Sequence, residues 1–396
     1  MKTQLVPLNV RGSWVSFFVL MGMLAFISAP LNLSLLEHIR YSDIFAVIAA
    51  GGAIFYIKFR LAGIVLVSAF CFLFFASALS GVESAADLFV TSAFFYKYIF
   101  LVMLVFIASL FLADDRGFFW FSLLFVFVYF FLISWGFFYK YGLQYFYSGY
   151  ISPRISFPSN NYEQSDGHLY SFVLGFFILT YMYFYRHFFR VPPFISLLLV
   201  FSSLFVLVAT GSRTGVFLLS VLVFFRIFVE LTLGCRIFRN LLVLVLLVVS
   251  FVLMWLTFGE EVRAFQFDLF SDESSSSRVR KLSDAFVDYS KGYFLVGVGP
   301  AGASHVWYDG FFSALLVHFG PLVFLLIFLL LVYVCVSILK VGNFSIKLLL
   351  FSMLGYVFLG SLITEYILSS RGALLVFLPL AMFFHARARL EMESNN

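Results

Sequence analysis

The sequence predicts an all-α membrane protein that crosses the bilayer many times. Of its 396 residues, 63% are hydrophobic and only 11% are charged, whereas soluble proteins typically carry about 25% charged residues. The 59 phenylalanines and the mean hydropathy of +1.05 fit side chains that face lipid better than a surface that faces water. These observations exclude soluble enzyme folds, and we treat residues 1–396 as a single integral membrane domain.

The lengths of the apolar runs predict the number of membrane spans. A helix needs about 20 mostly apolar residues to cross the hydrocarbon core, and by this measure we predict about 12 transmembrane helices. The predicted spans are residues 14–33, 42–58, 61–80, 88–112, 117–139, 169–189, 193–209, 213–229, 240–258, 309–337, 344–364 and 370–386. We interpret the first run as a span and not as a cleaved signal, because no small-residue cleavage site leads from it into a soluble domain.

Charge predicts the orientation of these spans. With a cytoplasmic N-terminus, the inside segments hold more Lys and Arg than Asp and Glu, and the outside segments hold the reverse. The positive-inside rule therefore favours two cytoplasmic termini. Two large periplasmic loops, 140–168 and 259–308, then lie on the outer face, and loops longer than about 12–15 residues are usually functional or disordered.

Several classes of chemistry have no support in the sequence. The 3 cysteines are Cys71, Cys235 and Cys335, and they lie in or beside apolar stretches, which argues against a disulfide framework or a cysteine metal site. The letters from Gly297 to Gly302 match GxGxxG, but Pro300 and the adjoining span are incompatible with a dinucleotide-binding βαβ unit. We expect no metal ion and no cofactor, and the dispersed basic residues argue against nucleic acid as a partner.

Arginines on the predicted outer face are candidates for binding an anion. Arg213 lies between Gly211 and Gly215 at the start of a predicted span, where free N–H groups and the helix dipole add to its charge. The glycines leave room for a ligand, and the alternative role for Arg213 is an interfacial anchor. Arg278 and Arg280 in the second loop form another basic group, for which the alternative is a solvated surface.

Four further residues on that face could contact a substrate. Arg154 lies between turn-forming prolines of the first loop, and Arg371 begins the last predicted span. Asp309 opens the span 309–337, where it could cap the helix or act as a general base for a sugar hydroxyl. His305 lies four residues earlier, and such a histidine is either a packed residue or a ligand contact. Lys97 lies inside a span, so we expect it to face a polar cavity or to reach the membrane surface.

Taken together, these outer-face features resemble the O-antigen polymerase/ligase superfamily of bacterial envelope glycosyltransferases, in particular its Wzy-type polymerases. The resemblance is best over roughly residues 154–330 and rests on the number of spans. It also rests on Gly211 to Gly215 opening a mid-chain span, the late outer loop with Arg278 and Arg280, and the segments Gly297 to Pro300, Asp309 to Phe312 and His318 to Gly320.

The resemblance implies a specific reaction. Family members join glycans carried on polyprenyl diphosphate at the outer face of the bacterial inner membrane, without metal or nucleotide. Ligases of the superfamily usually have a His-Asn pair before the glycine that matches Gly320, and here those positions are Asp309 and Gly310, which favours a polymerase. The implied partners are a lipid-linked glycan donor and acceptor, membrane lipid and a chain-length regulator protein.

The residues and the resemblance together suggest roles for the candidates. Preorganised arginines can stabilise a diphosphate leaving group without a metal. We expect the catalytic residues to be Asp309, Arg213 and Arg280, and the substrate-binding residues to be Arg154, Arg278, Arg371 and His305. Two other classes of protein stay open, a flippase for lipid-linked oligosaccharides and a noncatalytic assembly partner. A flippase would need charges along several spans, whereas here the charges lie mainly at the faces of the membrane.

Overall fold

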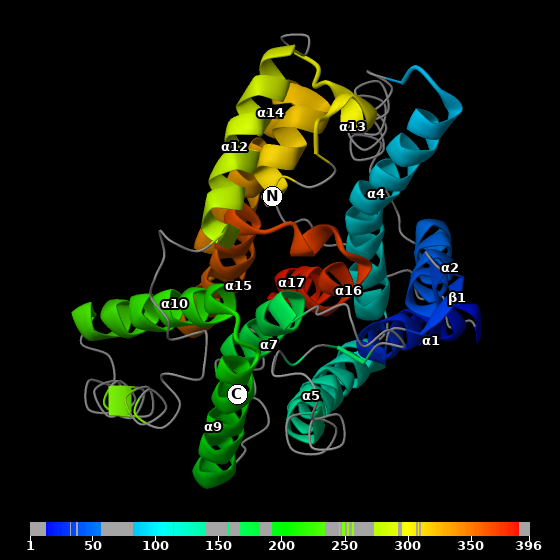
Figure 1. Ribbon diagram of the computed structural model, residues 1–396. Coiled ribbons are helices and arrows are strands. Elements are labelled where there is room, and N and C mark those ends of the chain that lie inside the picture. Colours follow the sequence, from blue (N-terminus) through cyan, green and yellow to red (C-terminus); the bar gives the residue numbers. More distant parts are fainter. Residues whose placement is uncertain are drawn as a thin grey trace.

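The chain is mainly helical wherever its structure is described (Figure 1). The computed structural model describes residues 13–31, 33–36, 39–56, 82–113, 115–139, 155, 157–158, 167–182, 192–233, 273–291, 295–305, 308 and 310–387, with isolated helical positions between 245 and 256. A small antiparallel pair of strands, β1 (Ser34–Leu36) and β2 (Ile39–Arg40), precedes the second long helix.

The helices follow the apolar runs of the sequence. In chain order they are α1 (Ser13–Ser28), η1 (Ala29–Leu31), α2 (Tyr41–Tyr56), α4 (Ala85–Ala113), α5 (Asp115–Phe138), α7 (Gly167–Thr180), α9 (Pro193–Ala209), α10 (Arg213–Thr232), α12 (Glu273–Lys291), α13 (Gly299–Gly302), α14 (Phe311–Leu339), α15 (Phe344–Ile363), η5 (Tyr366–Leu368), α16 (Ser370–Gly372), the π-helical η6 (Ala373–Phe377) and α17 (Leu378–His385).

Within the described residues, 6 helices are long and apolar enough to cross a membrane. They are α1 with η1, α4, α5, α10, α14 and α15, and shorter apolar helices include α2, α7 and α9. The general prediction of an all-α membrane protein is therefore confirmed. The count of about 12 spans stays a prediction, because residues 61–80 lie outside the described part and 240–258 are described only at isolated positions.

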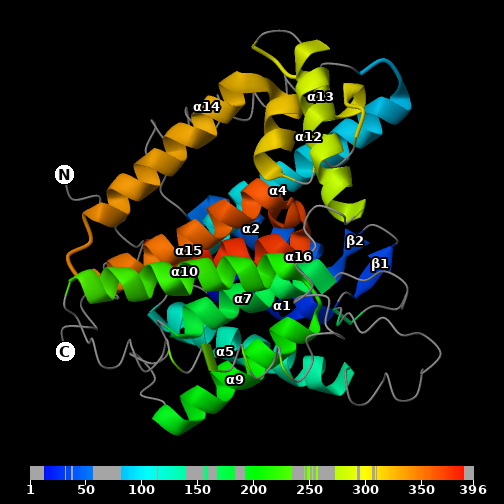
Figure 2. The same ribbon diagram turned by 60° about the vertical axis from the view of Figure 1, so that its left-hand side comes forward.

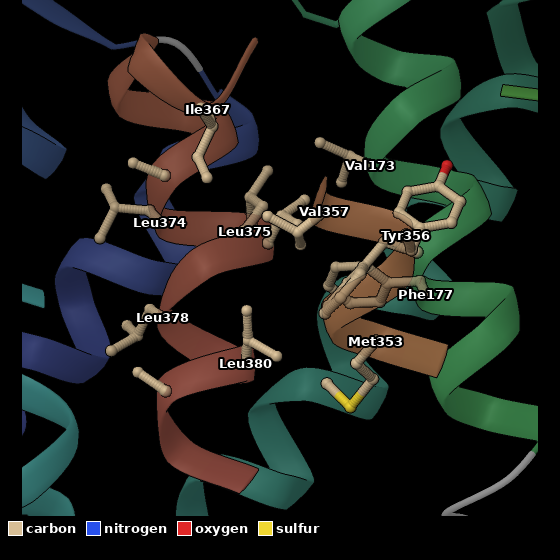
Figure 3. Packing of buried hydrophobic residues seen from close by; sticks show 14 of the residues in the cluster. Val173, Phe177, Met353, Tyr356, Val357, Ile367, Leu374, Leu375, Leu378 and Leu380 are labelled. Atoms are coloured by element: carbon tan, nitrogen blue, oxygen red, sulfur yellow. The ribbon is translucent and has the colours of Figure 1, made fainter. Parts of the chain in front are cut away.

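The core forms around α7, which is buried on every side. All residues from Leu169 to Thr180 are buried, as expected for a helix that is apolar all round. In Figure 3, Val173 and Phe177 of α7 face Met353 and Tyr356 of α15, with the leucines of the C-terminal helices alongside. Tyr356 also donates a hydrogen bond of 2.8 Å to the carbonyl of Phe172, so the packing of α15 on α7 is fixed by a polar contact.

The helix α14 is divided by a kink at Gly320 and Pro321. Gly320 has φ 81° and ψ 178°, a conformation that is essentially restricted to glycine. The residues before the kink are mostly buried, and nearly all of those after it are apolar side chains that are exposed or half-buried. The first part of α14 therefore belongs to a protein interior, whereas the second part has the surface of a lipid-facing span.

The kink also explains the glycines that mimic a dinucleotide motif. A Cβ on Gly297 would lie 2.2 Å from the carbonyl oxygen of Val317, and one on Gly320 would lie 2.6 Å from the nitrogen of Gly297. The amide of Val298 donates to the Val317 carbonyl at 2.9 Å. The segment before α13 is thus pressed against the kink of α14, which requires glycine on both sides.

Candidate functional site

Polar side chains from distant parts of the chain meet at one end of the helices. Apolar helices that pack side by side bring together the polar residues at which they begin or end, and here α2, α4, α14, α15 and α16 do so. We call this cluster the polar junction, and it consists of Arg40, Asp43, Lys97, Tyr308, Glu365, Ser370 and Arg371.

Glu365 is the centre of the polar junction. It is buried between α15 and η5, and its Oε1 accepts a hydrogen bond of 2.6 Å from the backbone amide of Tyr308. Its carboxylate is also close enough to Lys97 of α4 for an electrostatic interaction. A buried carboxylate is stable only with such partners, so Glu365 ties three separate segments together.

Arg371 is among the most deeply buried side chains in the part of the protein described. It is 1% exposed, and its guanidinium carbon lies 5.2 Å from the centre of the Phe157 ring. Phe157 in turn packs edge-on against Tyr170 at the start of α7, with 5.0 Å between ring centres. A short piece of the predicted first loop therefore reaches the polar junction, and a buried guanidinium there marks a costly and specific feature.

A second ionic group lies beside Arg371. Nη1 of Arg40 donates to Oγ of Ser370 at 3.0 Å, and the buried carboxylate of Asp43 interacts with both residues. These contacts join the strand β2 and the start of α2 to the C-terminal helices. The polar junction thus contains groups of both charges, as expected for a site that binds a charged ligand or for a structural ionic network.

His318 packs among aromatic rings and not among polar groups. Its ring centre lies 5.0 Å from that of Phe94 and 5.8 Å from that of Tyr308, and Lys97 lies over the same Phe94 ring at 4.5 Å. Neither ring nitrogen of His318 has a hydrogen-bond partner among the residues described. We interpret His318 as a packed residue next to the kink of α14.

Asp288 of α12 is bound by four hydrogen bonds. Its Oδ1 accepts from Oγ of Ser304 at 2.6 Å and from Nζ of Lys291 at 2.9 Å, and its Oδ2 accepts from the amide of Ser304 at 2.8 Å and from the hydroxyl of Tyr308 at 2.5 Å. Burial alone would raise the pKa of Asp288, but these hydrogen bonds outweigh it and hold the pKa well below its usual range. Burial, followed by the contact with Asp288, raises the pKa of Tyr308. Asp288 is therefore a structural carboxylate.

His305 and Asp284 form an accessible pair next to this network. Nε2 of His305 lies 2.6 Å from Oδ2 of Asp284, and each side chain is 34% exposed. The His305 ring also packs edge-on against Tyr308, with 5.8 Å between the ring centres. A carboxylate that orients a histidine while leaving the ring accessible is an arrangement that supports proton transfer.

The structure places the candidate residues from the sequence unequally. His305 is connected to Glu365 through Tyr308, and Arg371 is buried against Phe157. Arg280 is exposed on α12, one turn before Asp284. Arg278 lies on α12 and Arg213 is the first residue of α10, and only their backbones are described; Arg154 and Asp309 lie outside the described residues.

The glycines beside Arg213 have structural roles. Gly211 has φ 66° and turns the chain between α9 and α10. A Cβ on Gly215 would lie 1.9 Å from Oγ of Ser171, so this glycine permits close packing of α10 on α7. Ser212 also lies 3.1 Å from Nδ1 of His168. Turn formation at Gly211 and helix packing at Gly215 therefore account for both glycines, and a role in leaving room for a ligand stays a prediction.

Asp284 is a site residue that the sequence analysis did not identify. The sequence predicts a loop over this serine-rich segment, whereas Asp284 and Asp288, four residues apart, share one face of α12. In the sequence, only this spacing of four residues indicates that the two aspartates lie side by side on a helix.

The comparisons give no family assignment. No family model matches the chain, and no curated protein matches it. In the part of the chain that the structure describes, no group of three or more His, Cys, Asp and Glu side chains could hold a metal ion.

Proposed function

We propose that the protein is a glycosyltransferase that polymerises oligosaccharide repeat units carried on polyprenyl diphosphate, as in O-antigen, capsule or exopolysaccharide synthesis. The observation that carries this proposal is the accessible His305–Asp284 pair, which lies one helical turn from the exposed Arg280 and adjoins the polar junction. A proton acceptor and a cation at the end of lipid-facing helices suit a sugar acceptor and a lipid-linked anionic leaving group.

The order of the helix ends supports a topology of about 12 spans. α2 begins at the polar junction, and α4 begins at the same end of the molecule, near α13, which supports a span at 61–80 between them. α10 begins at this end beside His168, and α12 lies at this end beside Tyr308, so a second crossing fits 240–258. Both termini then lie at the opposite end, and we propose that this is the cytoplasmic side of a bacterial inner membrane.

In the proposed reaction, the ring of His305 accepts the proton of the acceptor hydroxyl while Asp284 orients the imidazole. The acceptor oxygen attacks the anomeric carbon of the donor sugar. The bond from that carbon to the diphosphate oxygen breaks, and the diphosphate leaves with the electron pair. Arg280, with Arg213 and Arg278, would stabilise the charge on the diphosphate. With His305 as the proton acceptor, Asp309 would orient the acceptor hydroxyl, and Arg154 would position the glycan.

Polysaccharide analysis in a deletion strain tests the proposal. The strain is complemented with wild type, Arg280→Ala, Arg213→Ala or, as a matched control at the opposite end of α14, Lys340→Ala. Polymerase function predicts a ladder of chain lengths with wild type and Lys340→Ala, and single repeat units on the acceptor with the arginine variants. Normal ladders in both arginine variants would overturn the assignment of these residues.

The same experiment separates the alternatives. Full-length polymer that remains on its lipid carrier in the deletion strain would indicate a ligase, and repeat units trapped on the cytoplasmic side would indicate a flippase. A chain-length regulator as partner predicts that the ladder keeps a preferred length only when that protein is present.

A further inference from the structure

The helix α12 presents apolar side chains away from the protein. Val279, Leu282 and Phe286 are 70%, 47% and 66% exposed. Their spacing of three and four residues places them along one side of the helix. We call these three residues the apolar stripe.

Where α12 contacts the rest of the protein, a charged side chain is buried. Asp288 is buried there and hydrogen-bonded to Ser304 and Tyr308, and Ala285 is the small apolar residue beside it. A helix on a water-exposed surface buries its apolar side and exposes its polar side. In α12 the buried side combines the hydrogen-bonded Asp288 with the small Ala285, whereas its large apolar side chains are exposed, which favours contact of the stripe with lipid.

Charge on α12 indicates the chemistry of that solvent. Helical spacing places Arg280 and Lys291 together on a side of the helix well away from the stripe. Arg280 is exposed, and the Lys291 side chain is 59% exposed even though it pairs with Asp288. A helix with large apolar residues on one side and basic residues on another fits the boundary between lipid tails and phosphate head groups.

The direction of α12 agrees with such a position. In Figures 1 and 2, α12 lies beyond one end of α10 and is steeply inclined to it, and α10 is one of the helices long enough to span the membrane. It packs against the first part of α14, whose second part exposes apolar side chains such as Phe328. The helix α12 thus packs against the beginning of a span whose remaining part is lipid-facing.

We propose that α12 is an interfacial helix whose apolar stripe lies in the outer leaflet of the membrane, with lipid as its partner. Part of the second predicted loop is then membrane-bound and not free in the periplasm. This placement holds Arg280 at the depth of lipid phosphates. The inference does not depend on the proposed enzymatic activity.

Spin labelling in lipid nanodiscs tests the proposal. A cysteine-free chain is labelled singly at Leu282→Cys, Phe286→Cys, Lys291→Cys or Phe328→Cys, and collisions with oxygen and with a water-soluble nickel chelate are measured. We expect Leu282→Cys and Phe286→Cys to resemble the lipid-facing reference Phe328→Cys, with oxygen collisions several-fold above those with nickel. We expect Lys291→Cys to show the reverse.

Two results would overturn the proposal. Nickel accessibility at both stripe positions equal to that of Lys291→Cys would place the stripe in water. Spin–spin broadening at the stripe that disappears on dilution with unlabelled protein would instead mean that a second copy covers it. Two stripe positions are labelled because one variant could fold incorrectly, which size-exclusion chromatography would detect. The accessibility of the other position then tests the proposal.

Discussion

At the scale of single residues, two aspartates one helical turn apart have different roles. Asp288 is buried, and its two oxygens accept four hydrogen bonds, so it has no capacity left for a substrate. Asp284 is partly exposed and contacts His305. The first carboxylate stabilises the segment that leads into α14, and the second is available to orient a histidine that remains accessible to a ligand.

Replacing Asp288 should therefore affect stability. Asp288→Asn leaves buried donors without a charged acceptor, and we expect the free energy of unfolding to fall by about 1–3 kcal/mol. The measurement is denaturant unfolding in detergent micelles, with Asp284→Asn as the matched control, for which an exposed pair predicts a change below about 1 kcal/mol. Equal losses in the two variants would contradict the distinction.

The stabilisation by Asp288 should also depend on pH. Because its pKa is lower in the folded protein than in the unfolded chain, its contribution is complete above the unfolded value of about 3.9 and is lost as pH falls through the folded pKa. The difference in stability between wild type and Asp288→Asn should be constant near neutral pH and shrink below about pH 4. A difference that grows on acidification would exclude this cause.

Replacing His305 should affect turnover more than folding. If it accepts the proton of the acceptor hydroxyl, His305→Ala should lower kcat by about 10²–10⁴-fold, and added imidazole should restore part of the activity. The assay measures polymerisation of a fluorescent polyprenyl-diphosphate-linked repeat unit by purified protein, with exposed Ser290→Ala as the control. Activity in His305→Ala equal to that of the control would remove His305 from the mechanism.

Sequence alone could indicate where Arg371 lies along the chain but not what surrounds it. Hydropathy predicts that Arg371 begins the last apolar run, because helices end where polar residues resume. Its contact with Phe157, and the contact of Arg40 with the adjacent Ser370, depend on the packing of segments far apart in the sequence. No pattern within one segment carries that information.

At the scale of elements, the kink of α14 determines how the segment before α13 packs. Gly320→Ala would place a side chain in a conformation that costs about 1–3 kcal/mol for residues other than glycine, and its Cβ would also lie 2.6 Å from the nitrogen of Gly297. We expect a loss of unfolding free energy of at least about 2 kcal/mol. Gly51→Ala is the control, because it lies inside α2 with no atom within 4 Å of the added Cβ, and alanine is favoured there by up to about 1 kcal/mol. Equal stability of the two variants would exclude a structural need for glycine at the kink.

The sequence predicts some elements better than others for a physical reason. Long helices such as α4 and α15 match the predicted ranges within a few residues, because a bilayer requires long apolar runs. The helix α12 was missed, because its serine run and its charges give no apolar period of sufficient length. It is stabilised by contacts of Asp288 with Ser304 and Tyr308, which hydropathy does not report.

At the scale of the whole molecule, the polar junction requires several helix ends to lie on one side. Arg40 precedes α2 and contacts Ser370, which begins α16. Tyr308 precedes α14 and contacts Glu365, which follows α15. Two helix ends lie on the same side of a membrane only if the chain crosses the membrane an even number of times between them. The four ends can therefore meet only if each pair is separated by an even number of spans. The charge pattern of the loops leads independently to the same grouping.

This parity argument leads to a testable topology. The crossing proposed at 61–80 separates Lys58 from Glu83, and α14 separates the junction end from Lys340. Single cysteines at these three positions in a cysteine-free chain are treated with a membrane-impermeant maleimide in intact cells and after permeabilisation. We expect Glu83→Cys to react in intact cells, whereas Lys58→Cys and Lys340→Cys react only after permeabilisation, because a bilayer about 30 Å thick separates the two sets.

Reaction of Lys58→Cys and Glu83→Cys from the same side would remove the span at 61–80. Because that loss would place the start of α2 on the opposite side of the membrane from α16, the contacts of Arg40 and Asp43 with Ser370 are the structural reason to expect the crossing.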